Sequence, residues 1–377
     1  MRDSTSVISL AAGIALGIGA FSFLASTQSS FNPSDAGLGP NTVSRSASLD
    51  GLRINSVGYS LADVAVAMRS FRERRSPVAL WLGASQLHAI NHYVPGDALA
   101  VDHANRSARD RGAAQTYVQV SLANANFHEF LTEFLALRRR GVTPTSLVVA
   151  ALYDDLRDAG IRDSVLIDLG DLPDSVLARG GTGIQNIAVA LREARVASES
   201  QHSPIGVSAM GGTPQQRLES GLMRRMDEHW DAYRDRGRLL AKTQVMLRAL
   251  IARAMGGMMS RRASPVPPDV QQWNMAAFDD LIRVARTDGI RLLIYKPPHR
   301  PGEKIFYHDR TAYDEWHRMI RQRCEREGIG YLDLETLVPG DLYGLTNEGR
   351  PDVFHFQGAG HRLLGAAIDN YFAQTER

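Results

Sequence analysis

The sequence predicts an α/β fold in which a mostly parallel sheet is covered by helices on both faces. Three observations lead to this prediction: short uninterrupted apolar runs, amphipathic helical stretches, and their regular alternation along the chain. Of the 377 residues, 44% are hydrophobic and 22% are charged, which is typical of a globular protein. The net charge of +2 gives no indication of nucleic-acid binding. A fibrous, wholly disordered or polytopic membrane protein is excluded.

The strands are predicted from apolar runs that are continuous rather than alternating, as in strands buried on both faces of a parallel sheet. These runs lie at 78–82, 116–121, 146–152, 291–295 and 331–334. Apolar residues at helical spacing predict the helices between and after them. The helices are expected at 60–75, 127–140, 184–197, 313–326 and 358–372.

The segment between the third and fourth predicted strands does not follow this alternation. It contains a glycine-rich turn, a helical stretch, an arginine-rich pattern at about 216–254 and a group of three prolines ending at Pro268. We interpret about 170–275 as a helical insertion. Its apolar tail, 246–259, either packs on the core or forms a surface for a partner or a membrane.

The first residues predict export. The uncharged apolar run 7–25 would form a helix roughly 28 Å long at about 1.5 Å per residue, close to the thickness of a bilayer core. Cleavage after Ala25 would place Phe23 where a signal peptide usually has a small residue, so an uncleaved anchor is favoured over a signal peptide. The main domain is then expected on the periplasmic or extracellular side. The predicted organisation is an anchor or signal peptide at 1–27, a flexible tether at 28–55 and the α/β domain at 56–377.

A serine follows the first predicted strand. The carboxyl ends of parallel strands form the crevice in which open α/β sheets bind ligands. Gly83 and Ala84 leave room for a tight strand-to-helix turn, from which Ser85 can present its hydroxyl to that crevice. The alternative is that Ser85 only caps the helix that follows.

An acid and a base precede the last predicted helix. A serine nucleophile needs a base within hydrogen-bond reach, and a carboxylate must hold that base in one tautomer. Asp352 and His355, three positions apart in a predicted turn, meet both needs. His361 is interpreted as helix surface. The alternative for the whole block is an ordinary turn followed by a capped helix.

These two blocks resemble the SGNH/GDSL hydrolase superfamily, in which a Gly-x-Ser block follows the first strand and an Asp-x-x-His block precedes the last helix. The resemblance extends over about 78–372 and implies a three-layer, flavodoxin-like parallel sheet. It also implies that Ser85 is the nucleophile, His355 the general base and Asp352 the carboxylate that orients it. No cofactor and no metal are implied.

The loops after the second and third strands depart from the family pattern, which usually has a glycine N–H and an asparagine side chain as oxyanion donors. The N–H of Ala123 or Asn124 is therefore predicted as a donor, with Asn124 or Asn126 replacing the missing side chain. Asp154 and Asp155 stand where the asparagine would be expected. An ionised carboxylate repels an oxyanion, so neither aspartate replaces an amide.

Two cationic residues follow the fourth predicted strand. Lys296 and His299 are expected at the edge of the crevice, where they either bind an anionic polymer or belong to a solvated basic turn. Trp81, which lies inside the first predicted strand, is expected in the core rather than as a platform for carbohydrate.

Metal-dependent hydrolysis is a third hypothesis. His88 and His92 are one helical turn apart, with Asp97 or Asp102 downstream. Ordinary hydrogen bonding of these histidines is the alternative. The single cysteine, Cys324, has no companion for a disulfide or a thiolate metal site.

An exported, anchored and divergent domain of this kind resembles accessory proteins of membrane-bound O-acyltransferases, such as those of D-alanyl transfer and alginate acetylation. This resemblance implies an esterase or O-acyltransferase that acts on an acylated envelope polysaccharide, a related polymer or a small ester. A membrane-bound O-acyltransferase is the implied partner. The second hypothesis is a non-catalytic binding or assembly subunit of an envelope acylation or export system, motivated by the aspartate pair and the insertion.

Overall fold

The computed structural model describes most of the α/β domain. The described residues are 39, 42–57, 61–156, 159–170, 176, 180–200, 265–303, 309–346 and 349–375. The chain divides into two units, of which Gly37–Arg195 with Arg261–Arg377 contains the sheet. The other unit, Met1–Ala36 with Val196–Ser260, lies almost entirely outside the described residues.

The predicted anchor at 7–25 and the arginine-rich and apolar parts of the predicted insertion lie outside the described residues. In the part of the chain that is described, no helix combines the length and the apolar composition needed to cross a membrane.

Six parallel strands form the central sheet, in the order β10-β9-β8-β5-β7-β4. Their bounds are β4 Asn55–Val57, β5 Val78–Gly83, β7 Thr116–Ser121, β8 Ser146–Ala150, β9 Arg291–Lys296 and β10 Gly330–Asp333. Without the edge strand β4, this is the flavodoxin-like order. The prediction of a parallel α/β sheet is confirmed, and all five predicted strands are present.

Short strands also form where a flexible tether was predicted. β1 Val43–Ser44 pairs with β6 Ala89–Ile90, and β2 Ser48–Leu49 pairs with β3 Leu52–Arg53. The buried side chain of Asn55 accepts the Ala47 N–H at 2.7 Å and donates to the Arg45 carbonyl at 2.9 Å. Any flexible tether therefore ends well before residue 55, because hydrogen bonds between side chains and backbone hold this polar segment on the domain.

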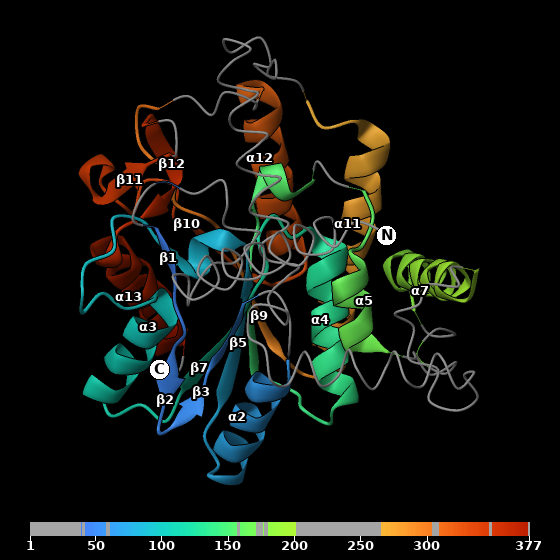
Figure 1. Cartoon of the computed structure of the whole chain (residues 1–377), viewed down its shortest axis with the longest axis horizontal. Helices are drawn as coiled ribbons and strands as arrows, with labels where there is room; N and C mark the ends of the chain where they lie inside the picture. Colours follow the sequence, from blue (N-terminus) through green and yellow to red (C-terminus); the bar gives the residue numbers. More distant parts are fainter. Residues whose placement is uncertain are drawn as a thin grey trace, which may run out of the picture. The chain divides into compact units, whose positions relative to one another are not determined.

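Helices cover both faces of the sheet (Figure 1). On one face lie α3 Ala100–Asp110 and α13 Gly358–Thr375, which pack on each other. The other face is covered by α4 Phe127–Arg139, α11 Pro268–Thr287 and α12 Arg310–Arg326, where Phe127 contacts the rings of Phe278 and Trp316. The remaining helices are α2 Ala62–Glu73, α5 Asp163–Leu169 and α7 Thr182–Ser200.

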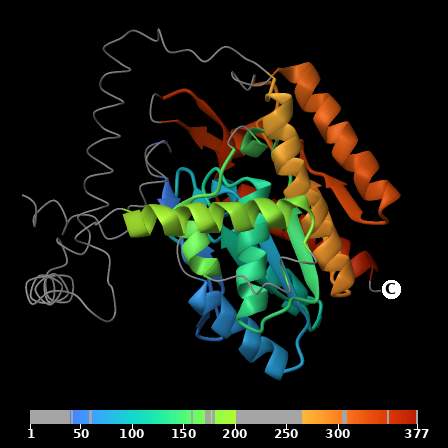
Figure 2. The same cartoon turned by 90° about the vertical axis from the view of Figure 1, so that its right-hand side faces the viewer.

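Three helices were not predicted: α3, α5 and α11. The buried positions of α3 recur at helical spacing, but they are mostly small alanines with one valine and one asparagine, so the prediction missed an amphipathic helix. Pro268 was interpreted as closing the insertion, but it occupies the first turn of α11, where a missing N–H is tolerated. α11 is an integral part of the helical layer, and an ion pair of 2.7 Å between Asp279 and Arg323 joins it to α12 (Figure 2).

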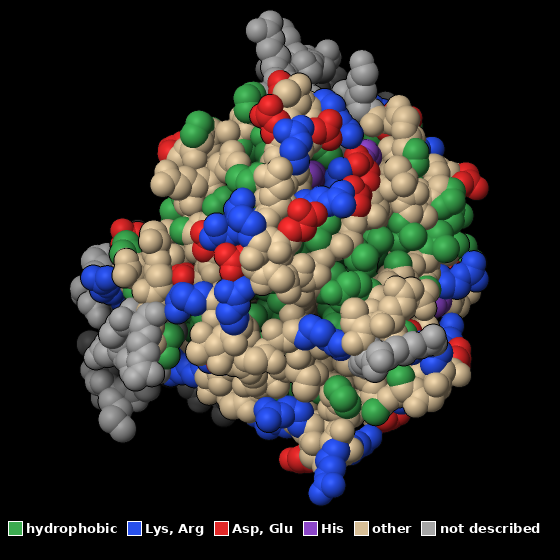
Figure 3. Space-filling view, turned by 180° about the vertical axis from the view of Figure 1, so that it is seen from behind, with side chains coloured by type: hydrophobic (Ala, Val, Ile, Leu, Met, Phe, Trp, Pro, Cys, Tyr) green, Lys and Arg blue, Asp and Glu red, His purple; other side chains and the backbone are tan. Residues whose placement is uncertain are grey.

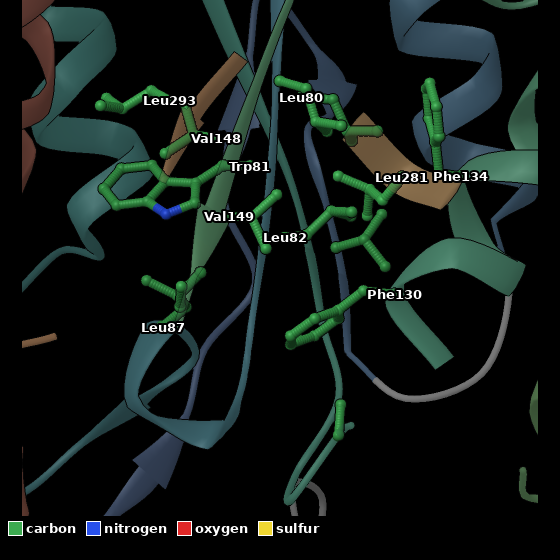
Figure 4. Close-up of a cluster of buried hydrophobic side chains, with 14 of the residues drawn as sticks. Leu80, Trp81, Leu82, Leu87, Phe130, Phe134, Val148, Val149, Leu281 and Leu293 are labelled. Carbon is green, nitrogen blue, oxygen red and sulfur yellow. The ribbon is translucent and has the colours of Figure 1, made fainter. Parts of the chain in front are cut away.

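The core lies on both sides of β5, whose six residues are all buried. Trp81 points to one side with Leu87, Val148 and Leu293, and Leu80 and Leu82 point to the other with Phe130, Phe134 and Leu281 (Figure 4). Trp81 is 0% exposed, and its indole N–H donates to the Tyr295 hydroxyl at 3.2 Å. The expectation that Trp81 belongs to the core is confirmed.

Acidic and basic side chains are interspersed on the face seen from behind (Figure 3). On α12, for example, Arg310 pairs with Asp314 at 2.9 Å and Arg321 pairs with Glu325 at 3.1 Å. These pairs are one helical turn apart and mostly exposed, so each contributes little to stability. No large field of one sign dominates the face shown.

Replacement of Trp81 by alanine is expected to lower the free energy of unfolding by about 3–5 kcal/mol, because it leaves a cavity in the central strand. Urea unfolding followed by far-ultraviolet circular dichroism measures the change. Ile167→Ala is the matched control, since this side chain is 78% exposed and its loss is expected to cost less than about 0.5 kcal/mol. Equal effects of the two substitutions would contradict the placement of Trp81 in the core.

Candidate active site

Ser85, His355 and Asp352 form a continuous hydrogen-bonded chain. The Ser85 Oγ lies 2.9 Å from the His355 Nε2, across 270 positions of sequence. The His355 Nδ1 lies 3.0 Å from one carboxylate oxygen of Asp352 and 3.2 Å from the other. The His355 and Asp352 side chains are only 12% and 7% exposed, whereas Ser85 is half-buried. The structure thus brings together the three residues predicted for nucleophile, base and orienting carboxylate.

The end of β5 positions Ser85. Gly83 ends the strand, Ala84 is extended, and Ser85 begins the 3₁₀ turn η2 Ser85–Leu87. A Cβ on Gly83 would lie 2.5 Å from a methyl group of Leu87, so a larger residue at this turn would require the Leu87 side chain to shift. No side chain caps η2, and the capping role considered for Ser85 therefore does not apply.

The order of the strands explains why this turn opens into a crevice. The chain leaves β5 for β7 on one side, and β8 pairs with β5 on the other. Helices that follow neighbouring strands then lie on opposite faces of the sheet, and the carboxyl ends between them form the usual ligand site. Ser85 lies at this point of reversal.

Asp352 and His355 lie in a bulged strand rather than in the simple turn that was predicted. β11 Tyr343–Leu345 pairs with β12 Pro351–Phe356, but the register shifts between the pairs Tyr343–Phe356 and Leu345–Pro351. The residues between these pairs bulge out. Within the bulge, one carboxylate oxygen of Asp352 accepts the N–H of Phe354 at 2.9 Å and of His355 at 3.0 Å. A local aspartate turn therefore places two side chains, three positions apart, on the same side.

Asp352 is held in its ionised form. Burial opposes ionisation of this carboxyl, but the charge of His355 and the hydrogen bonds from the His355 ring and from the N–H groups of His355 and Phe354 outweigh it. The pKa of Asp352 consequently lies below its usual value of 3.8. An ionised Asp352 favours the tautomer of His355 that carries its proton on Nδ1 and keeps the Nε2 lone pair for Ser85.

Asn91 is a site residue that the sequence did not reveal. Its side-chain amide donates to Asp352 at 3.1 Å and to the Leu345 carbonyl at 3.0 Å, and its backbone N–H donates to the Phe356 carbonyl at 3.1 Å. Asn91 is 0% exposed, and a Cβ on Gly344 would overlap its amide. No motif identifies this asparagine, because only the fold brings the loop after η2 against the β11–β12 hairpin.

Gln86 is a second residue that sequence reasoning missed. Its side-chain amide donates to the Pro298 carbonyl at 2.7 Å and to the Phe354 carbonyl at 2.8 Å. The residue after the predicted nucleophile is thereby tied to the residue before the predicted base. The only signal in the sequence is its position beside Ser85.

The loop after β7 lies beside Ser85. Gly83 is in register with Ser121, and the Leu122 N–H continues the ladder by donating to the Gly83 carbonyl at 3.0 Å. The loop that contains Ala123 therefore begins beside the strand end from which Ser85 follows. Within the described part of the chain, the backbone N–H groups of Ser85, Ala123 and Asn124 have no recorded acceptor. These donors are the ones that an oxyanion hole at this edge of the sheet would use.

Asn124 and Asn126 have different roles in this loop. Asn124 is exposed and adopts a positive φ of 52°, a conformation that asparagine tolerates better than most residues. Asn126, predicted as a substitute donor, is buried and caps α4 by accepting the Glu129 N–H at 3.1 Å. Its amide nitrogen donates to the Gly160 carbonyl at 2.8 Å. Both ends of the Asn126 amide are therefore engaged in holding the loop.

Asp154 and Asp155 lie in the 3₁₀ turn η3 Tyr153–Leu156, directly after β8. Their side chains lie outside the part of the structure that is described.

Lys296 and His299 do not form the open cationic edge that was predicted. Lys296 is 4% exposed, pairs with Glu335 and has its ammonium 4.9 Å from the centre of the Tyr313 ring. His299 is 7% exposed and lies 3.3 Å from Glu335. Burial opposes ionisation of Glu335, but the hydrogen bond and charge of Lys296, with the nearby His299 and Arg310, lower its pKa. This cluster anchors the loop in which the Pro298 carbonyl accepts a hydrogen bond from the Gln86 side chain.

Two further histidines near the site, His361 and His88, belong to the structural interior. His361, predicted on a helix surface, is 0% exposed and donates from Nε2 to the Ala89 carbonyl at 3.2 Å. Burial lowers the pKa of His361 to about 3. His88 contacts the Ser121 hydroxyl at 3.0 Å. Among the described residues, no three His, Cys, Asp or Glu side chains are grouped to hold a metal ion, which leaves the metal hypothesis without support from that part of the chain.

Comparison with known proteins gives likenesses of fold only. No protein-family model matches the sequence, and no curated protein matches it. Solved structures with a similar fold include a GDSL-like lipase from Bacteroides thetaiotaomicron, at 8% identity over 82% of this chain and 99% of that chain, with a TM-score of 0.37. A family two carbohydrate esterase from Clostridium thermocellum matches at 9% identity over 79% of this chain and 63% of that chain, with a TM-score of 0.35.

An aryl esterase from M. smegmatis matches at 12% identity over 79% of this chain and 99% of that chain, with a TM-score of 0.32. Because all three TM-scores lie below 0.5, we base no inference about chemistry on these matches. The chemistry is inferred from the side chains of this chain alone.

Proposed function

We propose that this protein is a serine ester hydrolase or O-acyltransferase of the SGNH type. The observation that carries the proposal is the chain of hydrogen bonds from the Ser85 hydroxyl through His355 to Asp352. It lies at the carboxyl end of a parallel sheet, where ligands bind in this kind of fold. A hydroxyl, an imidazole and a buried carboxylate in this order are the elements of nucleophilic acyl transfer.

In the proposed reaction, the Ser85 Oγ attacks the carbonyl carbon of an ester while the His355 Nε2 takes the hydroxyl proton. The ester C–O bond then breaks, and the imidazolium returns the proton to the leaving alcohol. A water molecule or a sugar hydroxyl next attacks the acyl-enzyme while His355 accepts its proton. The bond between the acyl carbon and the Ser85 Oγ then breaks, and the imidazolium returns the proton to Ser85. Asp352 stays ionised throughout and stabilises the imidazolium.

The oxyanion of the tetrahedral intermediate needs donors near Ser85. The backbone N–H of Ser85 and those of Ala123 and Asn124 in the loop after β7 are the groups we assign to this role. Water yields hydrolysis and a sugar hydroxyl yields transfer, so the same residues support either outcome.

For the setting, we propose an acylated envelope polymer as substrate, on the exported side of a membrane, with a membrane-bound O-acyltransferase as partner. The apolar run at 7–25 supports this part of the proposal. A purely binding role is the second hypothesis. The complete Ser–His–Asp chain favours turnover, because binding alone does not require a base within 2.9 Å of a hydroxyl.

The test is to treat the full chain with a fluorophosphonate probe, digest it and locate the adduct by mass spectrometry. We expect one adduct, on the peptide that contains Ser85, because only an activated serine reacts with such a probe at an appreciable rate. Heat-denatured protein is the control and should not react. Absence of an adduct, or an adduct on another residue, would reject the assignment of Ser85 as nucleophile.

A further inference from the structure

Arg162 contacts both the loop after β7 and helix α4. The Arg162 Nη1 donates to the Ala123 carbonyl at 2.9 Å. The other edge of the guanidinium binds Glu129 in a bidentate manner, with two contacts of 2.6 Å, and the Arg162 backbone N–H donates to Glu129 at 3.1 Å. The Glu129 side chain is only 2% exposed, so this is a built arrangement and not a chance surface pair.

The position of Glu129 is itself fixed. Its N–H is the group that the Asn126 cap binds at 3.1 Å, in the first turn of α4. The helix therefore holds the carboxylate, the carboxylate holds the guanidinium, and the guanidinium holds one carbonyl of the loop. A planar guanidinium with two parallel hydrogen bonds has little freedom to rotate.

Fixing the Ala123 carbonyl also fixes an N–H group. A trans peptide unit is planar, with its C=O and N–H pointing in opposite directions, and the structure has no cis peptide bond among the described residues. The Ala123 carbonyl and the Asn124 N–H belong to the same peptide unit. With its carbonyl directed at Arg162, this unit directs the Asn124 N–H away from Arg162.

We propose that Arg162, supported by Glu129, is a positioning residue that orients the Asn124 N–H as an oxyanion donor. The inference rests on the proposed function and adds to it the element that fixes this donor. It matters in this chain because the segment after β8 has Asp154 and Asp155 where the SGNH pattern has an asparagine, and a carboxylate has no hydrogen to donate. Donation then depends on backbone groups, whose direction must be set before the reaction. Arg162 acts through the peptide unit and does not touch the substrate.

The experiment compares Arg162→Ala with the parent in the hydrolysis of a short-chain p-nitrophenyl ester. Arg162→Ala leaves the Asn124 N–H in the chain but no longer fixes its direction. We therefore expect kcat to fall about tenfold to a hundredfold. KM should change less than twofold, since the oxyanion exists only after attack. The rate of fluorophosphonate labelling should fall in parallel. Added methylguanidinium, which can bind Glu129 and the Ala123 carbonyl, should restore part of kcat.

Arg138→Ala is the matched control. Arg138 lies on α4, as Glu129 does, and also forms a bidentate pair, with Asp288 at 2.6 and 2.8 Å, but at the far end of α4 from the loop. It should cost similar stability and leave kcat unchanged. Equal kcat in the Arg162 and Arg138 variants, or a loss in Arg162→Ala that methylguanidinium does not relieve, would overturn the inference. A parent without esterase activity and without labelling would instead reject the proposed function.

Discussion

Replacement of Ser85 by alanine is expected to lower kcat for ester hydrolysis by at least about a thousandfold. The substitution removes the only hydroxyl within hydrogen-bond reach of the His355 Nε2 among the interactions of the described residues. Without it, no acyl-enzyme forms, and the remaining groups only bind and polarise the ester. Steady-state hydrolysis of a short-chain p-nitrophenyl ester measures the loss, and circular dichroism verifies that the variant is folded.

Two comparisons make this result specific. Ser46→Ala, at an exposed serine of the β1–β2 region, should retain the activity of the parent. A double variant with Ser85→Ala and His355→Ala should be no slower than Ser85→Ala alone, because residues that act as one unit do not contribute additively. Retention of more than a tenth of the parent kcat by Ser85→Ala would reject Ser85 as the nucleophile.

The parts of the fold that could be predicted are those in which a single local pattern decides the structure. β5, β7 and β8 are buried along their whole length, so each appears in the sequence as a short, uncharged and mainly apolar run. β4 lacks such a run because it is short and mostly polar, and hydrogen bonds of the Asn55 side chain help to hold this segment in place. These bonds join residues eight and ten positions apart, and neither composition nor periodicity records them.

The same distinction explains which residues of the site could be predicted from the sequence. Ser85 and the pair Asp352–His355 each lie in a short block with its own chemical logic, and the order of the strands brings the two blocks together. Asn91 and Gln86 bind mainly backbone carbonyls, which every residue possesses, so no partner residue identifies them in the sequence.

Lys296 shows a different kind of error. Its place directly at the end of β9 was predicted correctly, but a position at a strand end does not determine where the side chain points. The partly buried Glu335, which follows the neighbouring strand β10, pairs with its ammonium group. A pairing between two strand ends becomes visible only when both strands are placed in the sheet.

Replacement of Asp352 by asparagine is expected to lower kcat by about four orders of magnitude with little change in the shape of the site. A carboxylate accepts the His355 Nδ1–H and so leaves the Nε2 lone pair for Ser85. An amide at this position can donate to Nδ1, which favours the tautomer with its proton on Nε2. That tautomer cannot take the proton of Ser85. Asp63→Asn, on the exposed surface of α2, is the control and should leave kcat unchanged.

Asp352→Asn is also expected to change how the free energy of unfolding depends on pH. Because the native pKa of Asp352 lies below its ordinary value of 3.8, the ionised carboxylate contributes stability that is fully present above that value. The contribution is lost as the pH falls through the lowered native pKa. The difference in free energy of unfolding between the parent and Asp352→Asn should therefore be largest near pH 7 and shrink below about pH 4. Urea unfolding at pH 7, 4 and 3 measures it. A difference independent of pH would show that the ionised carboxylate of Asp352 does not contribute to stability. The argument that this charge selects the tautomer of His355 would then be rejected.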